Sequence, residues 1–177
     1  MQGRKADLLS RPIEHIDIKA HDSRALVEAF RSMSFSAREL GEAAELYERM
    51  LRDRDCTVIL TVAGSTSAAG CMQVYVDMIW HNMVDAIVAT GATVVDMDFF
   101  EALGFRHYRG TQFADDGELR ELYVDRIYDT YIDEEELQAC DRTIKEIADG
   151  LEPRPYSSRE FIREMGRWLK GNPGRAK

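Results

Sequence analysis

The stretch Cys56-Thr-Val-Ile-Leu-Thr-Val-Ala63 is an unbroken run of β-branched and aliphatic residues, and Gly64-Ser-Thr-Ser-Ala-Ala-Gly70 follows it directly. A strand buried on both faces, as in a parallel sheet, has such a continuous apolar sequence. The small residues after it predict a tight turn, and the apolar residues from Met72 to Trp80 predict a helix. This stretch therefore predicts a strand, a turn and a helix in succession.

The same order occurs a second time. Met83-Val-Asp-Ala-Ile-Val-Ala-Thr90 predicts another buried strand, Gly91-Ala92-Thr93 a second turn, and residues 96–103 a helix. Repetition of strand, turn and helix is the unit of a parallel α/β sheet with right-handed crossovers. The sequence therefore predicts an α/β protein.

The flanking segments predict mostly helices. Residues 1–21 are expected to be irregular, and residues 171–177 to form a disordered tail, so one α/β domain is expected over residues 22–170. Ser157 and Glu160 have the spacing of a capping box at the start of a helix. The expected helices begin at Asp22, at Ser34 or Ser36, at Glu118 (ending at Asp129), at Asp133 (ending before Gly150) and at Ser157.

Composition and charge exclude several classes of function. The chain has 177 residues and a net charge of −9, which opposes binding to a nucleic-acid backbone and permits a cationic ligand such as a polyamine. The polar N-terminus and the absence of a long apolar run predict neither secretion nor a membrane span. The three scattered cysteines and four ungrouped histidines predict neither disulfides nor a metal site, and a cytoplasmic location fits them best.

The two predicted turns are the candidate ligand site. Ligands of open α/β sheets bind beyond the carboxyl ends of the strands, where small residues and a helix N-terminus suit a phosphate. A nucleotide or dinucleotide is therefore a sensible ligand for residues 64–70 and 90–93. The spacing is neither the GxGxxG fingerprint nor a P-loop, so a turn without a ligand is the alternative. Asp96 and Asp98 could bind a ribose hydroxyl or an ammonium group, or simply complement the helix dipole.

Two longer segments resemble the deoxyhypusine synthase family. They are Cys56–Gly70 and, more specifically, His81-Asn-Met-Val-Asp-Ala-Ile-Val-Ala-Thr-Gly-Ala92. The helical residues 22–50 are also similar to that family, and Phe99–Tyr108 and Tyr156–Phe161 resemble its bacterial and archaeal branch. The resemblance covers about residues 12–169.

The resemblance implies a Rossmann-like parallel sheet flanked by helices, with a helical segment at the N-terminal side, and a homotetramer. It also implies an NAD-dependent transferase that passes an aminobutyl group from spermidine, through an imine with an enzyme lysine, to a lysine of a translation factor (hypusine formation) or to a diamine such as putrescine. By the same resemblance the residues that contact NAD are Gly64, Ser65, Thr66, Ser67, Ala68, Thr90, Gly91 and Ala92. Asp96 takes the place of a glutamate that meets the polyamine.

The chain departs from the family in ways that leave its enzymatic activity open. The asparagine and serine usual at the ends of the first turn are Ser65 and Ala68 here, and the acidic pair is reduced to Asp96. The family's imine-forming lysine, active-site histidine and amine-binding tryptophan belong to a C-terminal half that this sequence does not contain. The alternative is therefore a non-catalytic NAD- or polyamine-binding or oligomerisation module.

Overall fold

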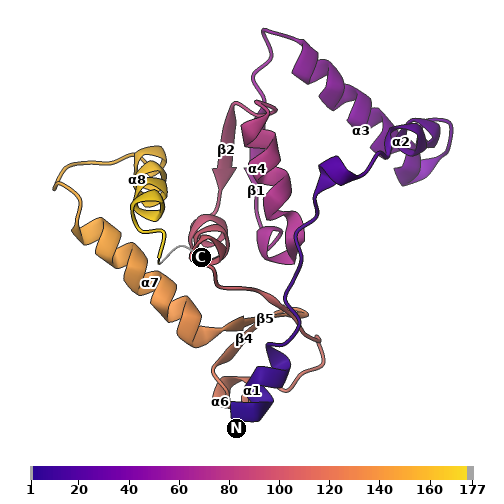
Figure 1. Cartoon of the computed structure of the whole chain (residues 1–177). Helices are drawn as coiled ribbons and strands as arrows, with labels where there is room; N and C mark the ends of the chain where they lie inside the picture. The colour runs from indigo at the N-terminus through magenta and orange to yellow at the C-terminus, as the bar shows by residue number, and fades with distance from the viewer. Residues whose placement is uncertain (1, 175–177) are drawn as a thin grey trace. The chain divides into compact units, whose positions relative to one another are not determined.

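The computed structural model of the chain describes residues 2–174, and it is a mixed α/β structure (Figure 1). Its contacts divide the chain into two compact units. Unit 1 contains Met1–Glu14, Ala63–Gly70 and Ala89–Lys177, and unit 2 contains His15–Val62 and Cys71–Val88. The segments of the two units alternate along the chain.

Unit 2 consists of a helical pair and a small parallel sheet. Hydrogen bonds join the residues that directly precede the two strands: the Val58 carbonyl accepts from the Asp85 amide at 2.8 Å, and the Val58 amide donates to Asp85 Oδ2 at 2.7 Å. The Tyr47 hydroxyl donates to the Met83 carbonyl at 2.9 Å, which fixes the longest helix to the second strand. The elements are a short 3-10 turn (Ile18–Ala20), α2 (Arg24–Phe30), α3 (Phe35–Arg52), β1 (Ile59–Val62), α4 (Met72–Trp80) and β2 (Ala86–Ala89).

The predicted Rossmann-like parallel sheet is present only in part. Among the described residues, only β1 and β2 form a parallel pair, and both strands are shorter than the apolar runs that predicted them. Side chains alternate in exposure along both strands, and Ile59 and Val88 are 57% and 59% exposed. The prediction of strands buried on both faces is wrong here, because a sheet of two strands has too few neighbours to cover its second face.

Unit 1 contains an antiparallel sheet of order β3-β5-β4. The hairpin pairs Val124 with Asp133 and Ile127 with Thr130, which leaves a two-residue turn at Tyr128 and Asp129. The elements are α1 (Gln2–Leu8), η2 (Ser67–Cys71, its last residue counted with unit 2), η3 (Thr93–Phe99), α5 (Phe100–Ala102), β3 (Tyr108–Arg109), α6 (Asp116–Glu121), β4 (Val124–Ile127), β5 (Thr130–Asp133), α7 (Glu134–Asp149) and α8 (Ser158–Gly171).

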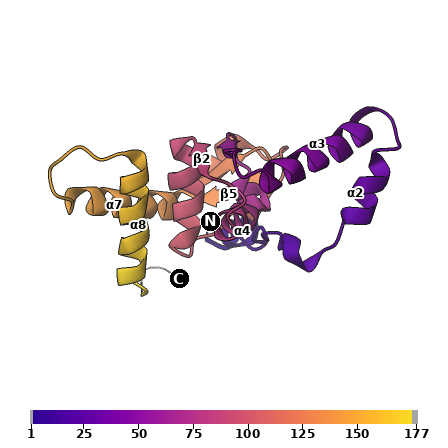
Figure 2. The ribbon, with the colours of Figure 1, turned by 90° about the horizontal axis from the view of Figure 1, so that it is seen from above.

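Two hydrophobic clusters hold unit 1 together. In the first, η3, α5, β5, α7 and α8 bury Phe99, Phe100 and Cys140, and Figure 2 shows α8 lying across α7. In the second, α6 and the hairpin bury Leu119, Val124 and Tyr131 against the end of α1. Arg4 donates to Glu118 at 2.8 Å and so joins α1 to α6 by an exposed ion pair.

Two segments of unit 1 differ from their predicted structure. The helix expected over residues 118–129 ends at Glu121, because Tyr123 takes a φ of 55° that no helix continues. The strand β4 follows, and its pairing with β5 supplies the backbone hydrogen bonds that the helix would have made. Residues 1–21, expected to be irregular, contain α1 and the 3-10 turn. Of the expected tail, Gly171 ends α8, and residues 175–177 lie outside the described part.

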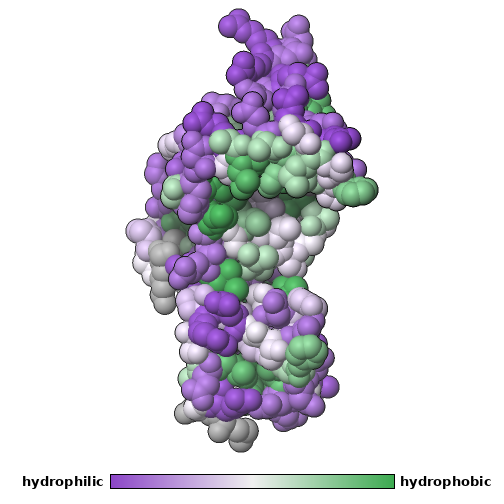
Figure 3. Space-filling view, turned by 90° about the vertical axis from the view of Figure 1, so that its right-hand side faces the viewer, coloured by the Kyte–Doolittle hydropathy of each residue, from purple (hydrophilic) through white to green (hydrophobic). Residues whose placement is uncertain are grey.

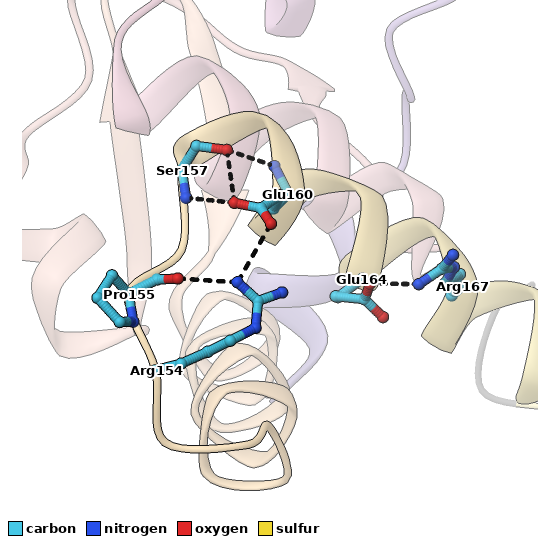
Figure 4. Close-up of polar contacts among 6 residues, drawn as sticks. All are labelled: Arg154, Pro155, Ser157, Glu160, Glu164 and Arg167. Carbon is cyan, nitrogen blue, oxygen red and sulfur yellow. Dashed lines mark hydrogen bonds and ion pairs between the residues drawn. The ribbon is translucent and has the colours of Figure 1, made fainter.

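The predicted capping box is confirmed at the start of α8. The Ser157 hydroxyl accepts from the Glu160 amide at 3.2 Å, and Glu160 Oε2 accepts from the Ser157 amide at 2.9 Å (Figure 4). Arg154 donates to Glu160 Oε1 at 3.1 Å and to the Pro155 carbonyl at 2.8 Å, which orders the linker before the helix. The predicted helix from Asp133 is also confirmed as α7, with Asp133 accepting from the Glu135 amide.

Hydrophobic side chains reach the surface among hydrophilic ones, as Figure 3 shows for one face. In unit 2, large exposed hydrophobic side chains lie on every helix and on both strands. The most exposed of them are Leu26, Phe35, Ile59, Ile79, Trp80 and Val88. None of the helices described is both long enough and apolar enough to cross a membrane.

Candidate functional site

The helical stretches that follow the two predicted turns are Ser67–Cys71 and Thr93–Phe99. The first is kinked at Gly70, whose φ of 104° is not helical, and the second is a π-helix rather than an α-helix. A π-helix closes its hydrogen bonds over five residues instead of four, and such segments are rare and frequently found at functional sites. The sequence predicted a turn and a helix at both places but gave no sign of the kink in the first or of the wider winding in the second.

The first turn requires glycine at two positions. Gly64 and Gly70 have φ values of 77° and 104°, in the region that residues with a side chain rarely adopt. A Cβ at Gly70 would lie 2.8 Å from the Glu14 carbonyl oxygen, so the turn packs closely on the N-terminal segment. At Gly64 and at Gly91 a Cβ would meet nothing within 4 Å, which leaves open space above both turns.

The first turn presents some of its predicted contact residues and buries others. Gly64 is exposed, and Ser65 and Thr66 are half-buried. Ser67 and Ala68 are 0% and 1% exposed, and the Ser67 hydroxyl has no hydrogen-bond partner. Ser65 and Thr66 can therefore reach a ligand directly, whereas Ser67 and Ala68 lie beneath the turn.

The second turn is accessible at all three predicted positions. Thr90, Gly91 and Ala92 are exposed and directly precede the π-helix Thr93–Phe99. The Thr90 hydroxyl lies 3.1 Å from the Thr93 hydroxyl, and the Thr90 carbonyl accepts from the Thr93 amide at 3.1 Å. These contacts fix the start of the helix, and both turns belong to unit 1.

Asp96 lies on the π-helix Thr93–Phe99, against α7. Burial raises the pKa of its carboxyl, and the nearby negative charge of Asp141 raises it further. Burial, with the charges of Asp141 and Asp96, also raises the pKa of the Cys140 thiol to about 12. The Cys140 sulfur donates to the Val95 carbonyl at 3.5 Å, so π-helix and α7 are in direct contact. Asp98, the other acidic candidate, is half-buried on the same π-helix.

Asp141 is a member of this site that the sequence did not reveal. It follows Asp96 by 45 residues and lies on the exposed side of α7. No local pattern links the two aspartates, since only the packing of α7 on the π-helix brings their charges together. The result is an acidic pair that favours an ammonium group over an anion.

Three of the described lysines, Lys5, Lys19 and Lys145, make ion pairs that suit surface cations. Lys5 binds Asp133 at 2.9 Å and Glu135 at 2.8 Å, and Lys19 binds Asp77 at 2.5 Å. These carboxylates raise the pKa of both lysines, although burial opposes the shift for Lys5. A lysine that forms an imine at neutral pH needs a lowered pKa, so neither suits that role. Lys145 pairs with Asp149 within α7, and Lys177 lies outside the described residues.

Among residues 2–174, no three histidine, cysteine, aspartate or glutamate side chains are grouped so that they could hold a metal ion.

Comparison with known proteins extends the sequence argument. The sequence model of the family described as Deoxyhypusine synthase matches residues 25–176. A "Deoxyhypusine synthase-like protein" of Coxiella burnetii is 60% identical over 169 residues, and one of Caulobacter vibrioides is 59% identical over 169 residues. A "Probable deoxyhypusine synthase 2" of Methanosarcina mazei is 35% identical over 158 residues.

These matches cover nearly all of this chain but only part of each relative. They span 96%, 95% and 89% of the chain, and 48%, 46% and 46% of the three relatives. The chain thus spans about half the length of the curated relatives it matches.

Proposed function

The chain belongs to the deoxyhypusine synthase family, and on that premise we propose that it supplies the NAD-contacting half of a deoxyhypusine synthase-like transferase. The transferase would move an aminobutyl group from spermidine to a lysine or diamine acceptor. The accessible second turn and the acidic π-helix that follows it are the observation that carries this proposal.

Two features support the first turn and the second turn as the place for NAD. The open space above Gly64 and Gly91 lets a ligand approach the backbone, which a Cβ at those positions would crowd. The hydroxyls of Ser65 and Thr66 are near the surface, where they can bind phosphate or ribose oxygens. Ser67 and Ala68 then support the turn from below. The chemistry that NAD supplies when bound is hydride acceptance.

Asp96 has the properties of an ammonium-binding group. Its half-buried carboxylate lies near the charge of Asp141, and an incoming ammonium would relieve the repulsion between them. Because Asp96 is one turn beyond the second predicted NAD segment, a polyamine held there would lie beside the cofactor. This is the arrangement that oxidation of an amine requires.

We expect the lysine for imine formation in the part of the relatives that this sequence does not span. Lys5 and Lys19 are engaged by carboxylates that raise the pKa of each amine, which is unfavourable for a nucleophile at neutral pH. A segment equivalent to the other half of the relatives would provide it, within the homotetramer expected from the family.

A non-catalytic binding module is the second candidate function, and the same lysine contacts favour it. Borohydride reduction in the presence of NAD and spermidine separates the two. A stable adduct on a lysine of this chain, located by mass spectrometry, would exclude the module.

The first test of the proposal is calorimetric titration of NAD into the purified chain with and without spermidine. We expect NAD to bind and spermidine to strengthen binding. Asp96→Asn should remove the effect of spermidine and keep NAD binding, whereas Glu152→Gln, which removes one exposed carboxylate elsewhere, should change neither. A folded sample that binds neither ligand would contradict the proposal.

A further inference from the structure

The N-terminal segment extends the antiparallel sheet of unit 1 at the free edge of β3. Pro12 forms an antiparallel bridge with Tyr108, and backbone hydrogen bonds flank this bridge on both sides. In one of them the Arg109 amide donates to the Arg11 carbonyl at 2.7 Å. Residues 11–13 therefore lie beside β3 as a further short strand, and both belong to unit 1.

This register places Arg11 directly opposite Arg109. Residues that face each other across an antiparallel pair project their side chains to the same side of the sheet, with Cα atoms about 5.5 Å apart where they are hydrogen-bonded. Both arginines are exposed. Their guanidinium groups therefore leave the sheet side by side, from two strands that are joined by backbone hydrogen bonds.

The position is unfavourable for two cations that have no counter-charge. A guanidinium stays charged at any physiological pH, and like charges directly opposite each other destabilise a sheet. Among residues 2–174, neither the Arg11 nor the Arg109 side chain forms an ion pair or hydrogen bond with another residue of that range. Arg4 and Arg126 of the same unit, by contrast, each have a carboxylate oxygen at 2.8 Å. The repulsion is thus left for an external anion to relieve.

The backbone under the arginine pair is firmly held. Arg109 pairs with Thr130 on β5, and the next residue, Gly110, donates its amide to the Asp129 carbonyl at 2.7 Å. A Cβ at Gly110 would lie 2.4 Å from the Tyr131 ring, so the chain packs closely on β5 at this point. Two cations on a fixed backbone can bind a ligand without the entropic cost of ordering a loop.

We propose that Arg11 and Arg109 together bind the phosphate group of a small phosphorylated molecule. A phosphate monoester carries nearly two negative charges at pH 7, which matches two guanidinium groups, and its oxygens suit their forked N–H donors. A carboxylate offers one charge and two oxygens, and each phosphate of NAD is a diester with one charge. The inference goes beyond the proposed NAD and polyamine function, since none of the residues of that site takes part.

The proposal links anion binding to stability. Unfolding separates Arg11 from Arg109, so phosphate should bind the folded state and raise the unfolding temperature of the wild type more than chloride does at equal ionic strength. Removing either charge should raise the unfolding temperature without phosphate, because the repulsion disappears. The same variants should lose the response to phosphate. A residue that only stabilises the sheet would show neither effect.

The test is calorimetric titration of inorganic phosphate into the whole chain in HEPES buffer at pH 8, together with thermal unfolding in phosphate and in chloride. We expect phosphate to bind the wild type, and Arg11→Gln or Arg109→Gln to lower the affinity roughly tenfold. Acetate, with a single charge, should bind more weakly than phosphate. Arg163→Gln removes an exposed guanidinium on α8 and should leave the affinity and the unfolding response unchanged.

Equal phosphate affinity in wild type, Arg11→Gln and Arg109→Gln would overturn the proposal. So would an equal loss in Arg163→Gln, which would indicate a response to net charge alone, or acetate binding as tight as that of phosphate. Titration of NAD into Arg109→Gln should match the wild type, and a reduced NAD affinity would assign the pair to the NAD site instead. Should one variant fail to fold by circular dichroism, the other decides the question.

Discussion

Nδ1 of His107 lies 2.6 Å from Oε1 of Glu101, and the imidazole has no exposed surface. This contact joins the end of α5 to the start of β3 inside the first hydrophobic cluster, where His107 also packs on the Phe100 ring. The contact satisfies Nδ1 of the buried imidazole, whereas Nε2 is buried without a hydrogen-bond partner. A buried polar pair of this kind stabilises little by itself but is costly to break on one side.

Glu101→Ala should therefore lower the free energy of unfolding by about 3 kcal/mol, because it leaves the imidazole buried without its partner. Urea unfolding followed by circular dichroism measures the loss. The matched control is Arg106→Ala, since Arg106 is half exposed and lies 3.8 Å from the other Glu101 oxygen. It should cost less than about 1 kcal/mol. Equal losses in the two variants would show that the buried contact is not the stabilising one.

The capping box gives a second prediction for stability. Ser157→Ala removes the hydroxyl that accepts from the Glu160 amide, and should cost about 1 kcal/mol. Ser158→Ala changes the same residue type one position later, inside the helix, and should be neutral or slightly stabilising. Thermal unfolding of both variants checks the difference, and a larger effect at Ser158 would contradict the capping assignment.

The carboxyl pair at Asp125 and Glu134 predicts a pH dependence of stability. The pKa of Asp125 rises from its ordinary value of 3.8 to about 6 on folding, so the folded state binds this proton more tightly than the unfolded state. Its contribution is complete below pH 4 and is lost as the pH rises through 6. The lowered pKa of Glu134 acts in the opposite direction, with a contribution present above pH 4.5 and lost as the pH falls.

Asp125→Asn keeps a hydrogen bond to Glu134 without the charge, so wild type should lose stability relative to this variant between pH 5 and pH 7. Urea midpoints of both proteins at the two pH values measure the effect. A difference in stability that stays constant across this interval would show that the pair does not share a proton.

The sequence predicted those parts of the fold that depend on local signals. The predictions of the capping box at Ser157 and Glu160 and of the acidic start of α7 were correct, because helix capping depends on residues within four positions of each other. The β4–β5 hairpin was missed because Tyr128, at the first position of its turn, has a φ of 55° that glycine or asparagine normally adopts. A tyrosine there gave no turn signal, and Val124 to Ile127 continued a helical pattern.

For the candidate site, too, the sequence predicted the features that depend on local signals and missed those that depend on packing. The two glycine-rich turns were visible in the sequence because a φ of 77° at Gly64 demands glycine locally. The sequence did not predict that Ser67 is buried or that Asp96 and Asp141 lie near each other. Both features arise from packing between segments that are distant in sequence. The same holds for the pair of Asp125 and Glu134, which the hairpin brings together.

Cys140 provides a chemical probe of the acidic site. With a pKa of about 12 instead of 9, its thiolate at pH 8 should be roughly a thousandfold scarcer than that of an ordinary cysteine. Timed alkylation with iodoacetamide and mass spectrometry should find Cys56 and Cys71, which are half-buried, labelled long before Cys140. Denaturant should make all three equal.

Because Asp141 and Asp96 both contribute to this shift, removing either charge should lower the pKa of the thiol. Asp141→Asn and Asp96→Asn are therefore expected to speed the labelling of Cys140 in the folded protein, with Glu152→Gln as the charge-matched control that leaves the rate unchanged. A cation bound between the two aspartates would act in the same direction as the substitutions, since it cancels the same field. Faster labelling of Cys140 on addition of spermidine, lost in Asp96→Asn, would place the polyamine at this site. An unchanged rate with saturating spermidine would instead mean that the amine binds elsewhere.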